Sequence, residues 1–339
     1  MYTFEEIIGN EWIIKQIQYA IEKKHISHAY VIQGQQGMGK KLLANTIAKT
    51  LQCQRGGITP CNECISCRTF DTKNHTDVFY VSPQKKKVLG VEDVREQIIE
   101  NMQIKQYQSP FKIFIVEKAD TMTQAAQNAL LKTLEEPPDY GILLLLTSNM
   151  DALLPTILSR CVVWKLRPLS AHAVEGYLLQ KHMAQKEEAA VFAEYAQGSI
   201  GKAIEIASSE AFSAMREDVT AKICSLQQKN LSDVLFMAKE LEVYKENQQF
   251  LDLIYLWYRD VLAYKKCNDI KYIIQKDKKH HIMQQAKQEQ EDAIAEKINA
   301  VWQAKQQLAV NGNFQLTMEV MLMKLKESSS NDRNCRDTF

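Results

Sequence analysis

The sequence has 339 residues, enough for two or three domains and a large buried core. Its 42 Lys and Arg residues balance 41 Asp and Glu residues, and the resulting net charge of +1 excludes a nucleic-acid polycation and an acidic disordered chain. With only 12 Gly and 7 Pro, the composition argues against a sandwich or barrel rich in tight turns and favours long helices.

The N-terminal segment carries acidic residues and lacks the apolar core of a signal peptide. The longest apolar run, at 142–146, is far shorter than the roughly 18 residues that a membrane span needs. We therefore expect a cytoplasmic protein with no membrane partner. In a reducing compartment its eight cysteines are not expected to form disulfides.

Five short apolar runs in the first half of the chain predict strands. They alternate with helical patterns and are apolar throughout, as expected for a parallel α/β sheet that is buried on both faces. The predicted strands are 30–33, 78–82, 112–116, 142–147 and 162–166.

Helices are predicted between these strands. The first covers 40–51, and the second covers 91–106 on the helical spacing of its apolar residues. A capping-box pattern at 121–124 precedes a third helix over 125–134, which Pro137 and Pro138 terminate.

The strand signal ends after Arg167. The segment 170–208 predicts three short helices, broken near Gly198 and Gly201, and 210–327 has the composition and periodicity of an all-helical domain. The tail at 328–339 is expected to be disordered.

We therefore predict three domains. An α/β domain covers 1–167, a small three-helix domain covers 168–209, and an all-α domain covers 210–327.

Gly34, Gly37, Gly39, Lys40 and Lys41 form a GxxxxGK pattern between the first predicted strand and a helix. In such a loop the glycines let backbone N–H groups face phosphates, and the first Lys reaches the outer phosphates. The last position normally carries Ser or Thr to hold Mg²⁺, and a Lys there repels a cation. Two interpretations stay open: a loop that binds ATP or ADP without normal Mg²⁺ chemistry, or a relic kept for the fold.

The predicted strand at 112–116 ends in Glu117 and Lys118. An ATPase of this layout carries Asp there for Mg²⁺ and then Glu to polarise the attacking water. Lys cannot accept a proton from water at neutral pH. Two such substitutions in one site argue against a working ATPase.

Cys53, Cys61, Cys64 and Cys67 lie within one short segment. Four thiolates at this spacing predict a tetrahedral Zn²⁺ site, which is structural because it has no open position. An Fe–S cluster and free surface thiols are the alternatives, although free thiols here are prone to oxidation. His75 lies outside the spacing and is expected to be an ordinary surface residue.

Four stretches of the sequence together resemble one family. They are the loop at 34–41, the cysteines at 53–67, ADTMTQAAQNALLKTLEEPP at 119–138 and LPTILSRC at 154–161. They resemble the AAA+ subunits of the bacterial DNA polymerase III clamp loader. Residues 1–208 resemble the whole AAA+ module with its helical lid, and 210–327 resemble, through weaker motifs, the helical collar through which these subunits oligomerise.

Two kinds of subunit share these motifs, the tau/gamma motor ATPase and the non-catalytic delta-prime subunit. The motor needs a GKT loop and an intact Asp-Glu pair, so the residues at 41, 117 and 118 resemble the delta-prime family. Taken by itself, Arg160 is better explained by a structural ion pair at the edge of a strand than by a functional role. The resemblance implies that Arg160 acts in trans as an arginine finger on a neighbouring motor's ATP, and that Gly201 replaces an Arg of the motor's lid.

The resemblance also implies a hetero-oligomer within the DNA polymerase III holoenzyme. Its partners are tau/gamma and delta subunits, the sliding clamp and primer–template DNA. The basic segments 85–87 and 276–281 are expected to be solvated turns rather than DNA contacts, and 251–262 mostly helix core. A tau/gamma-like motor and a zinc-dependent DNA-binding module remain alternatives, the latter disfavoured by the near-neutral charge.

Overall fold

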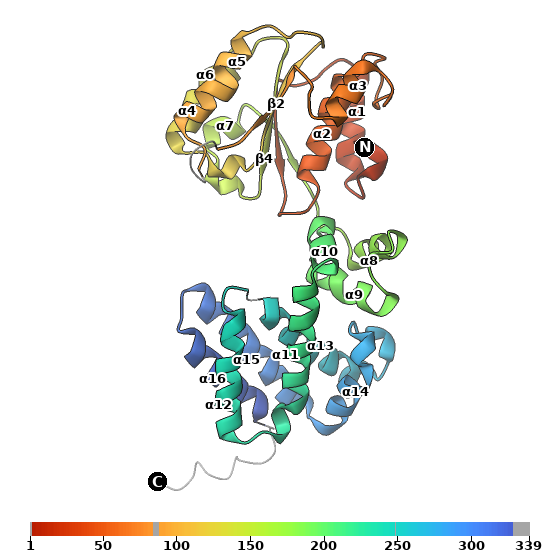
Figure 1. Ribbon diagram of the computed structural model, residues 1–339, viewed down its shortest axis with the longest axis vertical. Helices are drawn as coiled ribbons and strands as arrows, with labels where there is room; N and C mark the ends of the chain where they lie inside the picture. The colour runs from red at the N-terminus through yellow and green to blue at the C-terminus, as the bar shows by residue number, and fades with distance from the viewer. Residues whose placement is uncertain (1, 84–87, 248, 328–339) are drawn as a thin grey trace. The chain divides into compact units, whose positions relative to one another are not determined.

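The computed structural model describes residues 2–83, 88–247 and 249–327 (Figure 1). It divides into two compact units. The first comprises Met1–Ser170 and Gly198–Lys202, and the second Ala171–Gln197 and Ala203–Phe339. The basic cluster at 85–87 and the predicted disordered tail at 328–339 lie outside the described residues.

The first unit is built on a five-stranded parallel sheet with the strand order β2-β3-β4-β1-β5. The three inner strands are almost completely buried, whereas the two edge strands are only partly so. This confirms the predicted parallel sheet, with strand ends within one residue of those expected. The strands are β1 (Ala29–Gln33), β2 (Val78–Val81), β3 (Lys112–Val116), β4 (Gly141–Thr147) and β5 (Val162–Lys165).

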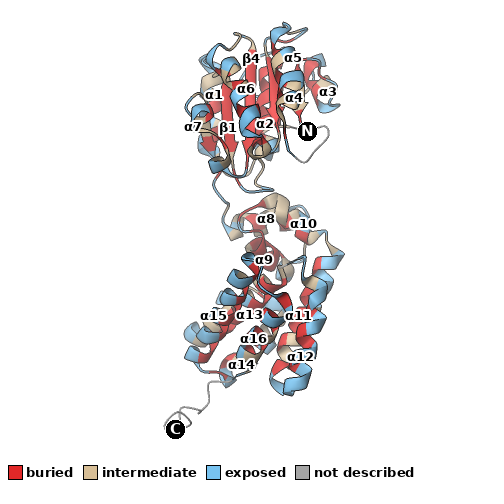
Figure 2. Cartoon of the chain, turned by 90° about the vertical axis from the view of Figure 1, so that its left-hand side faces the viewer, coloured by how far each residue is buried: buried red, intermediate tan, exposed pale blue. Residues whose placement is uncertain are grey.

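Helices cover both faces of this sheet (Figures 1 and 2). Alternate strand residues enter two separate apolar cores: Ile32 and Leu144 belong to one, and Val31 and Leu145 to the other. The first core contains side chains of α1 (Glu11–Glu22), α2 (Lys40–Leu51) and α3 (Ile65–Asp71). The second contains side chains of α4 (Val91–Val94), the π-helix η2 (Arg95–Ile99), α5 (Glu100–Gln103), α6 (Gln124–Glu135) and α7 (Pro155–Leu158).

The predicted capping box at 121–124 is wrong by two residues. Met122 forms an isolated parallel bridge with Leu89, so its backbone is extended. Thr121 therefore ends the 3₁₀ turn η3 (Ala119–Thr121), and α6 begins after Thr123, whose side chain accepts the Ala126 N–H at 3.2 Å. The helical segment predicted over 91–106 also ends early, at Gln103.

Three helices occupy the predicted region 170–208: α8 (Ala171–Gln180), α9 (Lys186–Tyr195) and α10 (Ile200–Ala207). The break at Gly198 is present, and this residue has a left-handed φ of 82°. A break at Gly201 is not, because Gly201 lies inside α10. The first turn of α10 groups with the sheet unit, and the other residues of these three helices with the second unit.

The second unit is helical throughout the part that the structure describes. Its longest helices carry a core of large side chains that include Phe250, Trp257 and Tyr258, as expected for 251–262. Its further α-helices are α11 (Glu210–Ser225), α12 (Leu231–Glu240), α13 (Gln249–Cys267), α14 (Lys279–Gln288), α15 (Glu291–Ala309) and α16 (Phe314–Lys326).

Short 3₁₀ helices connect several of these elements. They are η1 (Phe4–Glu6), η4 (Met150–Ala152), η5 (Leu226–Gln228), η6 (Leu241–Tyr244), η7 (Ile270–Tyr272) and η8 (Lys276–Lys278). In η8, Lys278 pairs with Glu217 at 2.9 Å, and the adjacent Asp277 pairs with Arg216 at 2.7 Å. Among the described helices none is both long and apolar enough to cross a membrane.

Candidate functional site

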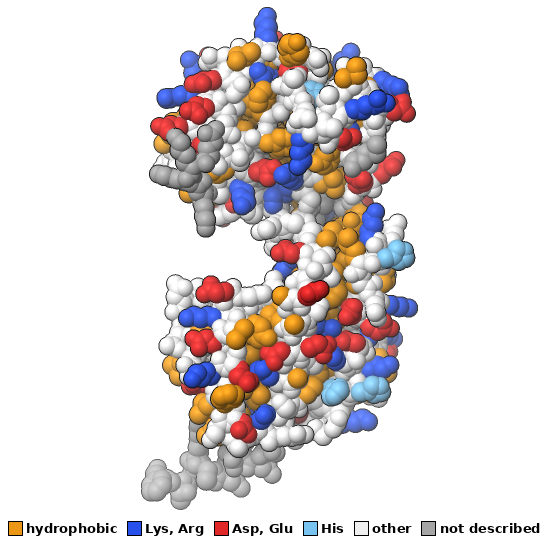
Figure 3. Space-filling view, in the orientation of Figure 1, with side chains coloured by type: hydrophobic (Ala, Val, Ile, Leu, Met, Phe, Trp, Pro, Cys, Tyr) orange, Lys and Arg blue, Asp and Glu red, His pale blue; other side chains and the backbone are white. Residues whose placement is uncertain are grey.

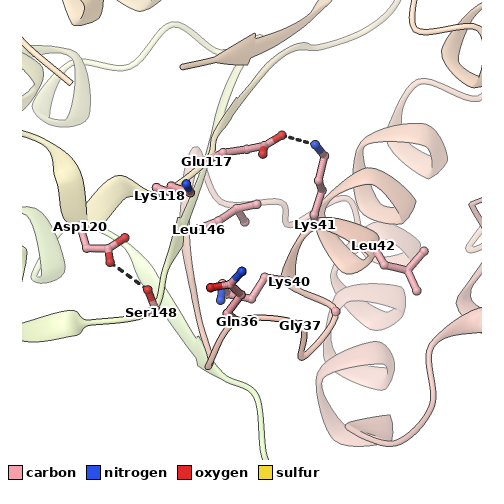
Figure 4. A pocket seen from close by; sticks show the side chains of 11 residues that line it. Gln36, Gly37, Lys40, Lys41, Leu42, Glu117, Lys118, Asp120, Leu146 and Ser148 are labelled. Atoms are coloured by element: carbon pink, nitrogen blue, oxygen red, sulfur yellow. Dashed lines mark hydrogen bonds and ion pairs between the residues drawn. The ribbon is translucent and has the colours of Figure 1, made fainter. Parts of the chain in front are cut away.

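The predicted phosphate loop joins β1 to α2, as its sequence pattern requires. Gly37 and Gly39 both have left-handed φ values, 79° and 90°, and Gly39 is the N-cap of α2. Beside the loop is a pocket of about 390 Å³. Figure 4 shows the side chains that line it, from the loop and α2 on one side and from the segment after β3 on the other.

Lys40 is turned back onto its own loop. Its ammonium group donates to the backbone oxygens of Gly34 at 2.5 Å and Gln35 at 2.9 Å. Burial lowers the pKa of this lysine, and the negative charge of Asp120 opposes that shift. The group that reaches phosphates in a working loop is therefore held by loop carbonyls in this structure.

Lys41 and Glu117 form an ion pair across the pocket, with the Lys41 Nζ 2.5 Å from the Glu117 Oε1 (Figure 4). These are the two positions at which the sequence departs from the usual Mg²⁺ ligands. The structure brings them together, so that the ammonium group of one neutralises the carboxylate of the other. Asp120, also in the pocket, accepts a hydrogen bond from the Ser148 hydroxyl at 2.9 Å.

The first turn of α10 is hydrogen-bonded to the phosphate loop. The Gly201 N–H donates to the Gly37 oxygen at 2.9 Å, and the Ser199 hydroxyl donates to the Gln36 oxygen at 3.0 Å. A Cβ atom added at Gly201 would lie only 2.7 Å from the Gly37 Cα. A larger residue at 201, an arginine included, would therefore require the backbone of the loop or of α10 to shift.

The four predicted cysteine ligands converge on one point between α2 and α3. Their Sγ atoms all lie within 4.8 Å of one another, and those of Cys61 and Cys67 are 3.9 Å apart. Tetrahedral Zn²⁺ with Zn–S bonds of about 2.3 Å requires sulfur atoms about 3.8 Å apart. Backbone N–H groups donate to three of the sulfurs, those of Cys53, Cys61 and Cys64, each at 3.4 Å. This donor set fits a structural zinc ion.

Two of the four thiols, those of Cys61 and Cys67, have pKa values shifted in opposite directions. Backbone N–H groups of Glu63 and Cys64 lower the pKa of Cys61 to about 6. Burial raises the pKa of Cys67 above its usual range. A metal ion is the partner that allows a buried thiol such as Cys67 to remain deprotonated.

His75 is buried, so the prediction that it is an ordinary surface residue is wrong. Its Nδ1 accepts the Asp77 N–H at 3.2 Å, which leaves the proton on Nε2. The Nε2 atom lies 2.9 Å from the Ser66 hydroxyl, and that hydroxyl donates to the Gln52 oxygen at 2.6 Å. His75 thereby contacts Ser66, the residue before the predicted ligand Cys67, and helps to hold the backbone of the cysteine cluster. The spacing of the metal ligands did not indicate this role.

The Asp77 carboxylate holds the loop at residues 107–109 in place. It accepts three backbone N–H groups, from Tyr107 at 2.7 Å, Gln108 at 2.9 Å and Ser109 at 3.2 Å. No motif of the sequence singled out this residue. Its burial on a turn before β2 depends on contacts more than twenty residues away in the chain.

Arg160 follows α7 and does not line the phosphate pocket as the described residues form it. Its Nη2 lies 2.7 Å from the Glu135 Oε1, and its Nη1 donates to the Thr156 oxygen at 2.9 Å and to the Ser159 hydroxyl at 3.2 Å. The ion pair expected of a structural arginine is thus present, with a partner that the sequence analysis did not identify. Burial raises the pKa of the adjacent Cys161 to about 12, so that thiol is unreactive.

Comparison with known proteins gives a relative that matches over nearly the full length of both chains. DNA polymerase III subunit delta' of Bacillus subtilis is 32% identical over 324 residues, which are 93% of this chain and 95% of that protein. The chain belongs to the clamp-loader subunit family of DNA polymerase III. The family model described as DNA polymerase III, delta subunit, matches residues 9–170, the strand-containing part.

A second clamp-loader relative is DNA polymerase III subunit tau of Bacillus subtilis, 27% identical over 96% of this chain and 62% of that protein. Among solved structures, a DNA polymerase III gamma subunit-related protein of Thermotoga maritima matches 93% of this chain and 99% of its own, with 19% identity and a TM-score of 0.39. At that score the family assignment rests on the sequence relatives. The fold agrees with it: a five-stranded parallel sheet with flanking helices, followed by a helical region.

Proposed function

We propose that this chain is a non-catalytic, delta'-like subunit of the clamp loader, which donates Arg160 in trans to the ATP of a neighbouring tau/gamma-type motor and so helps to load the sliding clamp on primed DNA. The ion pair between Lys41 and Glu117 carries the proposal. A Mg²⁺-dependent ATPase needs a hydroxyl and a carboxylate free to hold the ion. Here an ammonium group sits at one of these positions and neutralises the carboxylate at the other.

One further feature of the pocket supports a subunit that does not hydrolyse ATP. The close approach of Gly201 to Gly37 disfavours a phosphate-sensing arginine at that position, because even a Cβ atom there would force the backbone to shift. ATP or ADP at the glycine loop (Gly34, Gly37, Gly39, Lys40, Lys41) is therefore no part of the proposed mechanism.

The extent of the match to known subunits also supports delta'. The chain covers 95% of the delta' relative but only 62% of the tau relative, and its identity to delta' is the higher of the two, 32% against 27%. A tau/gamma-like motor is the alternative, because that relative too spans 96% of this chain.

Arg160 has the chemistry that the proposed role in trans requires. A guanidinium carries five N–H groups, and the contacts of Arg160 use three of them. The other two are enough for a bidentate contact with a phosphoryl group. In other systems an arginine supplied to a neighbouring ATP or GTP site accelerates hydrolysis by about 10³–10⁵.

A structural Zn²⁺ bound by Cys53, Cys61, Cys64 and Cys67 completes the proposal. The spacing of the four sulfurs and the N–H groups that donate to them support it. The ion would fasten the segment between α2 and α3, in whose described residues there is no helix or strand, to Cys67 in α3.

The proposed partners are the tau/gamma and delta subunits and, through the complex, the sliding clamp and primer–template DNA in the cytoplasm. Figure 3 shows basic and acidic side chains mixed over the face in view, without a large basic field. That distribution agrees with the net charge of +1 and with weak, salt-sensitive affinity for DNA by the chain alone. The near-neutral net charge argues against an independent zinc-dependent DNA-binding module.

Reconstitution tests the proposal. The purified chain is expected to hydrolyse no ATP, with or without primed DNA, but to co-purify with tau/gamma and delta subunits and to support their ATPase activity. Hydrolysis of ATP by the chain alone, stimulated by primed DNA, would favour the motor instead. Failure to co-purify with any of these subunits would contradict the proposal.

A further inference from the structure

We infer that Glu135 is a positioning residue for Arg160: its carboxylate orients the guanidinium so that the unused N–H groups face the neighbouring subunit. This inference rests on the proposed function, because it gives Arg160 a target in trans. The direct observation is the ion pair of 2.7 Å between the Arg160 Nη2 and the Glu135 Oε1.

Glu135 occupies a position that is unfavourable for its charge. It is the last residue of α6, and the negative end of the helix dipole disfavours a carboxylate there. A partner with a positive charge offsets this cost, and Arg160 is the partner that the structure supplies. Glu136, the next residue, has no such partner among the interactions found in the described part of the chain.

Helix α6 contacts the arginine segment at both of its ends. Near the start of the helix, the Gln127 side chain accepts the Leu154 N–H at 2.7 Å and donates to the Ala152 oxygen at 2.9 Å. At the end of the helix, Glu135 contacts Arg160. The segment from 152 to 160 is therefore attached to a single rigid helix, whose inner face is buried in the sheet core.

The contacts of Arg160 divide its guanidinium into two parts. Thr156 and Ser159 take both N–H groups of Nη1, and Glu135 takes one of Nη2. The remaining N–H groups are on Nη2 and Nε, which is a pair suited to two phosphoryl oxygens. An arginine side chain that is free to rotate loses rotamer entropy when it is fixed. Glu135 fixes it beforehand, so less remains to be lost as the phosphoryl contact forms.

The test uses the reconstituted complex with its motor subunits, and measures the kcat and KM of ATP hydrolysis in the presence of primed DNA. Glu135→Ala should lower kcat about ten-fold and leave the KM for ATP and the assembly of the complex unchanged. Glu135→Gln keeps an acceptor for the Nη2 group and should restore kcat to within about three-fold of the wild type. Glu136→Ala, the matched control on the neighbouring residue, should behave as the wild type.

Arg160→Ala and the double variant Arg160→Ala/Glu135→Ala separate this inference from the proposed function. If Glu135 acts through Arg160, the double variant should be no slower than Arg160→Ala alone. A wild-type kcat for Glu135→Ala beside an impaired Arg160→Ala would overturn the inference only. A raised kcat for Glu135→Ala would also overturn it, because it would make Glu135 a restraint that opposes the arginine. An unchanged kcat for Arg160→Ala would overturn the proposed function, and the inference with it.

Discussion

The phosphate pocket and the arginine segment belong to the same sheet unit but differ in how they use their charged groups. In the pocket, Lys40 donates to its own loop, and Lys41 pairs with Glu117. In the arginine segment, contacts within the chain take three of five guanidinium N–H groups and leave two for a ligand. Under the proposed function, the subunit keeps a phosphate pocket in which Lys41 and Glu117 neutralise each other, while it presents an arginine to another site.

The largest expected effect comes from removing the arginine, which tests whether the two regions differ in function. In the reconstituted clamp loader, Arg160→Ala should lower kcat of ATP hydrolysis by about 10³ or more for the site that it completes, because charge on the transferred phosphoryl group loses its partner. Size-exclusion chromatography should show that assembly of the complex does not change. Arg95→Ala, which removes an exposed arginine from a different helix of the same unit, is the control. Equal loss in both variants would contradict a specific role for Arg160.

Zinc removal tests whether the cysteine cluster stabilises the sheet unit, a contribution separate from those of the phosphate pocket and the arginine segment. At free Zn²⁺ a thousand-fold above its dissociation constant, binding contributes about 4 kcal/mol. A chelator, or Cys64→Ser, should then lower the Tm by about 8–16 °C, since each kcal/mol corresponds to about 2–4 °C in a domain of this size.

Metal analysis and thermal melts check this prediction together. The purified, reduced chain should contain about one Zn²⁺. Cys267→Ser is the matched control, because Cys267 is exposed and lies outside the cluster. A folded, reduced sample without metal would refute the zinc assignment, as would melting curves that do not respond to the chelator.

A smaller effect is expected from His75, on the pH dependence of the free energy of unfolding. Burial lowers its pKa, against the opposing charge of Asp77, so the folded state holds the imidazole neutral below the usual pKa of about 6.5. Its contribution to stability is complete above about pH 6.5 and is lost as the pH falls from there towards the folded pKa, because the unfolded chain binds the proton first. The slope for one proton reaches at most about 1.4 kcal/mol per pH unit.

Urea unfolding at pH 7.5 and 5.5, with zinc present, measures that slope. His75→Gln should lose less stability than the wild type over this interval, although it is less stable at pH 7.5. Because His75→Gln also removes the contact with Ser66 beside Cys67, the zinc content of both proteins is measured at each pH, and stabilities are compared where both retain the metal. Identical pH dependence in the two proteins would show that His75 is not held neutral.

The smallest expected effect is in the phosphate loop. A substitution there tests whether the pocket of this chain, unlike Arg160, contributes to ATP turnover. Lys40→Ala should leave ATP turnover of the reconstituted complex within about two-fold of the wild type, because this loop holds no reacting phosphate in the proposed mechanism. The same change in the phosphate loop of the motor subunit serves as the positive control. If both substitutions abolish turnover, this chain has an active site of its own.

Much of the architecture was predictable because its signals are local. The five apolar runs between helical patterns predicted the parallel sheet, and the glycine loop predicted the turn from β1 into α2. The cysteine spacing predicted which four sulfurs meet. Each of these depends on residues within a few tens of positions of one another.

The failures arose where a distant segment decides a local conformation. Pairing of Met122 with Leu89 moves the start of α6, and the approach of Gly201 to Gly37 keeps a glycine inside a helix. His75 is buried because Ser66 and Ser109 close over it. None of these contacts leaves a periodic pattern around the residue that it affects.

From its sequence alone, this protein has a parallel α/β unit, a helical C-terminal region, a phosphate loop that lacks the usual Mg²⁺ ligands, and four cysteines in metal-ligand spacing, because hydrophobic period and motif spacing are local properties of the chain. Only the tertiary structure decided the partners of the charged groups: Glu117 for Lys41, and Glu135 for Arg160. The reason is that strands and helices far apart in the chain must first assemble before a side chain meets the charge that satisfies it.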